Sequence, residues 1–199
     1  MPEALDMLEN PTLVEVLLCI VSGKDYSSAI AKALKKSQPT VTEQLKQLES
    51  AQLVNALGRK QALSFEVNWD MLLQVFYDVV FDILELREEY FSGIDLKRIT
   101  RSSLEGIVPR ILFKDFLKEY FSTVQDLGGK RKGFDEIIFS FFVAIERLDE
   151  RDWKKLLNQY QLDGVNLRDV ANVVGFEICA VEETALTGLI MTREEPNKK

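Results

Sequence analysis

A short polar stretch in the first third of the chain has the residue types of a surface that contacts DNA bases. It lies within residues 37–50, and its members are Gln38, Thr40, Thr42, Glu43 and Lys46. A glutamine amide can bond an adenine edge twice, threonine can pack on a thymine methyl, a carboxylate can accept from cytosine, and lysine can reach guanine or a phosphate. Displayed together on one helix, these side chains would have chemistry that fits contacts to bases.

The apolar residues around this polar set predict such a helix. Val41, Leu45 and Leu48 recur at i, i+4 and i+7 and form one stripe, which leaves the polar residues available to solvent or a ligand. Ser37 is placed to cap the helix, and Pro39 is tolerated because the first turn contains backbone N–H groups without intrahelical partners. The simplest alternative is a solvated face, which is what most charged helix faces are.

Two further helices are expected before residue 37. Asn10 followed by proline is typical of a helix start, and the almost wholly apolar residues 13–21 predict a buried helix that stops at Ser22-Gly23. A second helix is expected at about residues 27–36, with three lysines outward, namely Lys32, Lys35 and Lys36.

After residue 50 the apolar period changes to two. Leu63, Phe65 and Val67 alternate with Ala, Ser and Glu, which predicts a half-buried strand, and residues 53–57 supply its partner. The linker between the strands has a glycine for the turn and two cations at its tip, Arg59 and Lys60. The expected order is therefore three helices and a hairpin, which is how winged helix-turn-helix proteins present a helix to the major groove.

The charge of the chain is unevenly distributed. A formal net charge of −7 would ordinarily argue against a nucleic-acid partner, because affinity for DNA depends on neutralising phosphates. Residues 22–64 nevertheless hold seven basic and three acidic residues, a local charge of +4. This basic region coincides with the predicted helices and hairpin.

The first third of the chain also resembles a known family. The helix-turn-helix of ArsR-like and MarR-like prokaryotic regulators is similar to SSAIAKALKKSQPTVTEQLKQLESAQLV at residues 27–54, and their wing is similar to NALGRKQALSFEVN at residues 55–68. The resemblance implies that residues 37–50 form the recognition helix of a sequence-specific regulator of transcription that binds double-stranded DNA. It implies that five residues of this helix face the groove, namely Gln38, Thr40, Thr42, Glu43 and Lys46. It also implies that Arg59 and Lys60 lie on phosphates or in a minor groove.

Two features depart from that family pattern. Gln52 stands where such proteins usually end the recognition helix with glycine, so the entry into the wing is expected to be strained. The metal-sensing ArsR members carry Cys and His ligands, and this segment has neither. Only the DNA-binding shape is therefore carried over, and neither a metal nor a cofactor is expected.

The remainder of the chain is expected to be helical. We predict a mainly α protein with a winged helix-turn-helix at residues 1–68 and an all-helical dimerisation or regulatory domain at residues 69–199. A long helix at about residues 69–90 carries an a/d seam that predicts a homodimer, with Leu72, Phe76, Val79, Ile83 and Leu86. The alternative is that this stripe packs on later helices of its own chain. Those helices are expected at residues 104–124 with a break at Pro109, and at residues 134–148, 153–160 and 167–191.

Composition disfavours several other classes of protein. The absence of histidine removes the commonest general base and zinc ligand. The GGKRKG loop at residues 128–133 lacks P-loop spacing, which leaves a solvated basic loop or an auxiliary contact to the DNA backbone. No apolar run reaches the roughly 18 residues of a membrane span, and Cys19 and Cys179 are expected to be buried thiols.

We therefore expect a cytoplasmic protein that is not an enzyme and that has no catalytic residues. Its expected partners are double-stranded DNA, a second copy of the chain, and an effector that is a small molecule or a protein. The alternative function is a winged helix that serves as a protein-interaction module in a transcription-related or other assembly. The net negative charge keeps that alternative open.

Overall fold

The computed structural model describes residues 2–58, 63–87, 96–127 and 132–175. Its helices and strands, in chain order, are α1 (Pro2–Leu8), α2 (Pro11–Val21), α3 (Ser27–Leu34), α4 (Gln38–Ser50), β1 (Val54–Leu57), β2 (Ser64–Val67), α5 (Trp69–Arg87), the 3-10 helix η2 (Leu96–Arg98), α6 (Arg101–Ile107), α7 (Arg110–Leu127), α8 (Phe134–Glu146) and α9 (Glu150–Tyr160), followed by a helix at residues 164–175. The predicted fold class is confirmed: it is mainly α, with helices and then a hairpin in its first third.

The helix starts follow the capping signals of the sequence. Asn10 Oδ1 accepts a hydrogen bond of 3.0 Å from the Thr12 backbone N–H at the start of α2. Ser37 Oγ accepts one of 3.3 Å from the Thr40 N–H at the start of α4. Each satisfies an N–H that the first turn leaves without a helical partner. The short helix α1 was not expected, and it buries Leu8 in the core.

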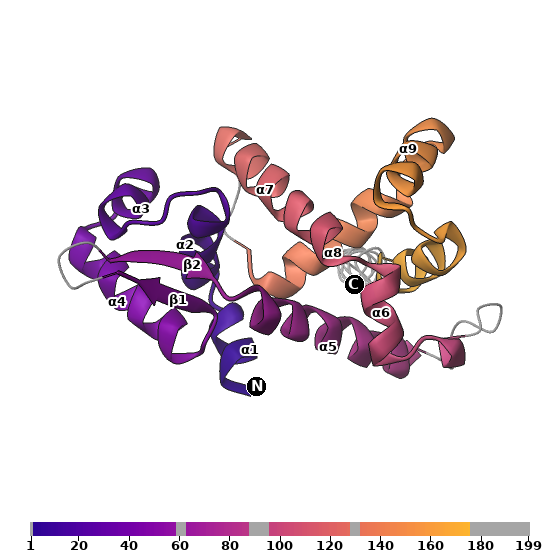
Figure 1. The fold of residues 1–199 in the computed structure, drawn as a ribbon, viewed down its shortest axis with the longest axis horizontal. Helices are drawn as coiled ribbons and strands as arrows, with labels where there is room; N and C mark the ends of the chain where they lie inside the picture. The colour runs from indigo at the N-terminus through magenta and orange to yellow at the C-terminus, as the bar shows by residue number, and fades with distance from the viewer. Residues whose placement is uncertain (1, 59–62, 88–95, 128–131, 176–199) are drawn as a thin grey trace, which may run out of the picture.

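The hairpin is tied to the helices on either side of it. Strands β1 and β2 pair antiparallel, with Val54 opposite Val67 and Leu57 opposite Ser64. The Phe65 N–H donates to the Asp25 carbonyl at 2.8 Å, which joins β2 to the turn between α2 and α3. Figure 1 shows the hairpin alongside α4, from which β1 directly continues. The wing therefore has a defined position relative to α4.

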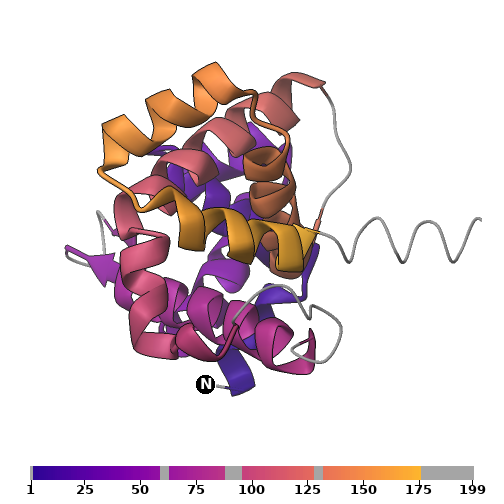
Figure 2. The same cartoon turned by 90° about the vertical axis from the view of Figure 1, so that its right-hand side faces the viewer.

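The C-terminal helices keep most of the predicted boundaries. The break expected at Pro109 separates α6 from α7, and the Val108 carbonyl beside it accepts a 2.8 Å hydrogen bond from the Tyr77 hydroxyl. The last predicted helix is described only over residues 164–175, and Figure 2 looks onto the end of the molecule where it lies with α6 and α9. No helix in the described ranges is long and apolar enough to cross a membrane.

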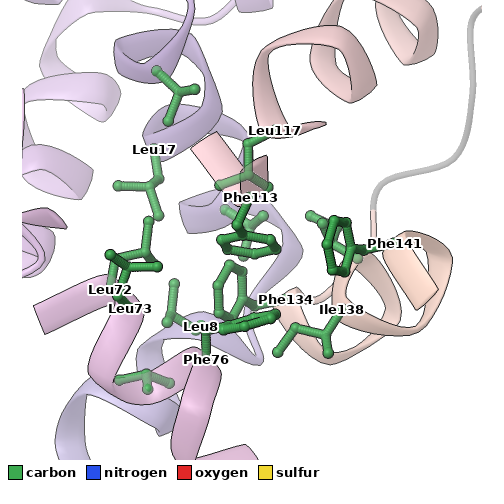
Figure 3. Close-up of a cluster of buried hydrophobic side chains, with 14 of the residues drawn as sticks. Leu8, Leu17, Leu72, Leu73, Phe76, Phe113, Leu117, Phe134, Ile138 and Phe141 are labelled. Carbon is green, nitrogen blue, oxygen red and sulfur yellow. The ribbon is translucent and has the colours of Figure 1, made fainter. Parts of the chain in front are cut away.

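A single apolar core joins the N-terminal and C-terminal parts. Figure 3 shows Leu17 of α2 near Leu117 of α7, and Leu8 near Phe76 and Phe134. The Phe76 and Phe113 rings are 4.1 Å apart between centroids, and both side chains are fully buried. The division at residue 68 stays a prediction, since buried side chains on its two sides pack into one cluster.

Candidate nucleic-acid interface

Helix α4 displays the predicted base-contacting residues together. Its apolar stripe of Val41, Leu45 and Leu48 has no exposed surface, so the helix cannot rotate without exposing that stripe to water. The side chains predicted to contact bases are all exposed, namely Gln38, Thr40, Thr42, Glu43 and Lys46. The structure thus presents these five polar residues on the solvent side of one capped helix.

Hydrogen bonds order the first turns of α4. Gln38 Nε2 donates to Ser27 Oγ at 3.3 Å, which links the start of α4 to the start of α3. The Thr40 and Ser37 hydroxyls lie 2.7 Å apart within the cap. Thr42 Oγ1 donates to the Gln38 carbonyl at 2.9 Å, so its hydroxyl proton is engaged and its oxygen can still accept a hydrogen bond. These bonds restrict the rotamers of the exposed face in advance of any contact.

The ion pair on this face is weak. Lys46 Nζ lies 3.8 Å from Glu43 Oε2, and both side chains are about two-thirds exposed, at 68% and 65%. Pairs of this kind contribute about 0–1 kcal/mol, because water and salt screen them. Lys46 can therefore exchange this carboxylate for a phosphate at little cost.

One of the three lysines predicted to point outward does not. Lys36 is half-buried and pairs with Glu15 of α2 at 3.2 Å, so the outward assignment of Lys36 was wrong. The physical reason is that α3 ends at Leu34 and Lys35 adopts a left-handed conformation with φ of 53°. Helical spacing therefore does not apply to Lys36, whereas Lys32 and Lys35 are exposed as expected.

The strained entry into the wing is confirmed at Gln52. Its φ of 59° lies in the left-handed region, where a side chain is disfavoured and glycine is not. Asn68 Nδ2 donates to the Gln52 carbonyl at 2.8 Å, and Asn68 Oδ1 accepts from the Met71 N–H at 3.3 Å. Asn68 thus caps α5 while it holds the left-handed residue in place.

The wing cations Arg59 and Lys60 lie outside the described residues. The residues that bracket their turn are described, and Leu57 opposite Ser64 forms the last pair of the hairpin before it. The turn between the strands and the contacts of its two cations stay a prediction.

The predicted dimer seam on α5 divides into two parts. Leu72 and Phe76 have no exposed surface, because the helix lies between the winged helix and the C-terminal helices. Val79 and Ile83 are half-buried, and Leu86 is 77% exposed. Only the C-terminal half of the seam is therefore accessible to a second chain in this conformation, and the dimer stays a prediction.

Sequence reasoning missed three residues that shape this surface. Ser27 and Glu15 were not singled out, because their bonds to Gln38 and Lys36 join different helices. Asn68 could have been found, since it precedes an apolar helical run just as Asn10 does. The rule that identified one cap identifies the other.

The thiol that the structure describes is not poised for chemistry. Cys19 is fully buried in α2, and burial raises its pKa to about 12, so it stays protonated at neutral pH. Cys179 lies outside the described residues. Over those residues, no group of three or more Cys, Asp or Glu side chains is arranged to hold a metal ion.

Helices α2, α3 and α4, the exposed polar face of α4 and the hairpin that follows it define a winged helix-turn-helix. Residues 10–56 match the family model described as bacterial regulatory protein, arsR family. The curated proteins and the solved structures compared with the chain gave no match. The N-terminal region is thus a winged helix-turn-helix that is similar to that of ArsR-family regulators, and this similarity supports a DNA-binding regulator of transcription.

We predict that Gln52→Gly stabilises the protein. The change removes the side-chain strain of a left-handed residue, and the greater freedom of glycine in the unfolded chain offsets part of that gain. The free energy of unfolding should rise by about 0.5–1 kcal/mol. The matched control Gln47→Gly, at an exposed position inside α4, should lower it by about 1 kcal/mol. Urea titration followed by circular dichroism measures both, and equal destabilisation by the two variants would contradict the assigned strain.

Proposed function

We propose that this protein is a homodimeric regulator of transcription that recognises specific double-stranded DNA sequences through α4. The observation that carries the proposal is the display of Gln38, Thr40, Thr42, Glu43 and Lys46 on a helix whose opposite face is wholly buried. Side chains that can read base edges are thereby exposed on a rigid support.

The first turns of α4 suit entry into a major groove. Recognition helices contact base edges mainly with their N-terminal residues, and Gln38, Thr40 and Thr42 lie in the first five residues of α4. Lys32 and Lys35 at the end of α3 are exposed near this helix and would attract phosphates. Arg59 and Lys60 would add backbone contacts from the wing.

A second function is supported by a different observation. The net charge of −7 is unusual for a protein that binds a polyanion, and a winged helix can instead bind another protein. In that case the exposed face of α4 would contact a partner within a transcription-related or other assembly. Duplex binding that depends on salt and sequence separates the two functions, because only a regulator shows both. In either role the chain acts by binding and not by catalysis.

The proposed dimer uses the accessible end of α5. Leu86 is the most exposed large apolar side chain in the described residues, at 77%, and Ile83 and Val79 lie one and two turns before it with part of their surface still accessible. A two-fold dimer through this end would present two copies of α4 to successive turns of the duplex. An effector of the regulator, small molecule or protein, belongs to the same proposal.

We predict that the helix and the wing make different contributions to DNA binding. Gln38→Ala or Thr42→Ala should weaken binding to the preferred duplex by about 1–3 kcal/mol and leave scrambled DNA almost unaffected, because base-edge contacts discriminate between sequences. Replacing Arg59 and Lys60 with Ala should weaken both duplexes alike and flatten the salt dependence.

The measurement is titration of wild type and variants against both duplexes at several salt concentrations. Gln47→Ala, also exposed on α4 but outside the proposed contact set, is the control and should bind as wild type does. A wing variant with altered sequence preference, beside helix variants that keep it, would show that α4 is not the recognition element.

We further predict that the protein in solution has twice the chain mass of 22.8 kDa. Leu86→Asp should shift it toward the monomer, because a charge in an apolar interface is costly. The control Val165→Asp changes a residue that is 70% exposed and lies outside α5, and it should leave the mass unchanged. Light scattering coupled to gel filtration measures this, and a wild type that is monomeric both free and DNA-bound would refute the dimer.

A further inference from the structure

A groove of about 920 Å³ lies between the wing and α7. One wall consists of the turn after α2 and the strands of the wing, including Lys24 and Leu57. The other consists of Trp69 at the start of α5 together with Lys114 and Lys118 of α7. Its lining includes residues of β2 and α7 and none of α4, and Figure 1 labels these three elements. Its volume is within the range of about 300–1,000 Å³ that is typical of small-molecule sites.

Aromatic rings hold two of the three ammonium groups of the groove. Lys114 Nζ lies 4.9 Å from the centroid of the Trp69 ring, and Lys24 Nζ lies 5.4 Å from that of Phe121. Cations at these distances are attracted to the ring face and keep their charge available on the other side. Lys118 is exposed at the rim, and over the described residues no ion pair joins any of the three lysines to a carboxylate.

The groove contains two acidic residues, which do not cancel its cations. Glu66 is exposed, and its carboxylate accepts a 3.5 Å contact from Asn55 Nδ2 on the neighbouring strand. Asp25 is half-buried in the turn that holds Phe65. Three ammonium groups against two carboxylates leave an excess of positive charge, and two serine hydroxyls in the lining add neutral donors, namely Ser64 and Ser122.

A larger groove between α5 and α6 is less suited to an anion. Its volume is about 1,010 Å³, and its cations are Arg101 and Arg110. Arg110 Nη1 lies 2.7 Å from Asp70 Oδ1, and Arg101 Nη1 lies 3.0 Å from Asp78 Oδ1. The lining of this groove contains three acidic residues, Asp70, Asp78 and Glu105, so its carboxylates outnumber its two cations. The lysine groove beside the wing has the opposite balance of charge.

We propose that the groove beside the wing binds a small organic anion, a carboxylate, phosphate or sulfonate with an apolar body. Lys24, Lys114 and Lys118 contact the anionic group, and the apolar body packs on Trp69 and on Leu57, which is 44% exposed. Because residues of β1 and β2 line the groove, a ligand bound there would contact the wing directly. An effect of the bound ligand on DNA binding rests on the proposed function, whereas binding of the ligand itself does not.

The probe is 8-anilinonaphthalene-1-sulfonate, and uncharged N-phenyl-1-naphthylamine is its neutral counterpart. The double variant Lys114→Gln/Lys118→Gln should lose about tenfold or more in affinity for the sulfonate, because two charge-assisted contacts are removed. Its affinity for the neutral dye should be unchanged. Lys154→Gln/Lys155→Gln on the exposed face of α9 is the matched control and should bind both dyes as wild type does. Dye fluorescence at low salt measures all three proteins.

Equal sulfonate affinities in the three proteins would overturn the proposal, and so would a groove variant that loses the neutral dye to the same extent. A second titration in the presence of duplex DNA tests the connection to the wing, since linked sites change each other's affinity by the same factor. Sulfonate binding that depends on the two lysines, in a protein that binds no duplex, would support the site and contradict only the proposed DNA function.

Discussion

Burial of helix α2 is the constraint on which the rest of the structure depends. Eight of its eleven residues are buried, from Leu13 through Val21, and they occupy every side of the helix. A helix that is apolar all round must be covered all round. Helices α3 and α4 and strand β2 cover one part of its surface, and α7 covers another. The winged helix therefore cannot complete its core without the C-terminal helices.

This shared core explains how a functional surface is held in position. The stripe on α4 is buried where α4 packs on α2 and α3, which leaves its polar face directed to solvent. The Phe65 N–H bond to Asp25 and the Asn68 bond to Gln52 fix the wing to the same body. Because α7 also packs on α2, its lysines come to lie opposite the wing. The recognition helix, the wing and the groove are thus three outer surfaces of one core.

Most of the fold could be predicted from local signals. Apolar spacing and caps such as Asn10 and Ser37 located the helices to within a few residues, because hydrogen bonds within four residues determine a helix start. The exposed face of α4 followed from the same spacing. The left-handed conformation of Gln52 was expected from the resemblance to ArsR-like regulators, in which glycine occupies that position.

The remainder depended on tertiary contacts that spacing does not reveal. The heptad pattern on α5 identified buried positions but not the partner that buries them, and Leu72 and Phe76 proved to lie in the chain's own core. Lys36 was misassigned because the helical turn ended two residues earlier than expected. The groove is assembled from residues as far apart in the sequence as Lys24 and Lys114, so no local pattern could have indicated it.

The measurement that tests the central claim most directly is selection of bound duplexes from a random DNA pool, with wild type and the Gln38→Ala/Thr42→Ala double variant in parallel. Recognition through α4 predicts that wild type enriches one motif with two related half-sites about 34 Å apart. The double variant should fail to enrich it while still binding DNA at low salt. Selection that yields no motif, together with duplex binding that does not respond to salt, would contradict the account.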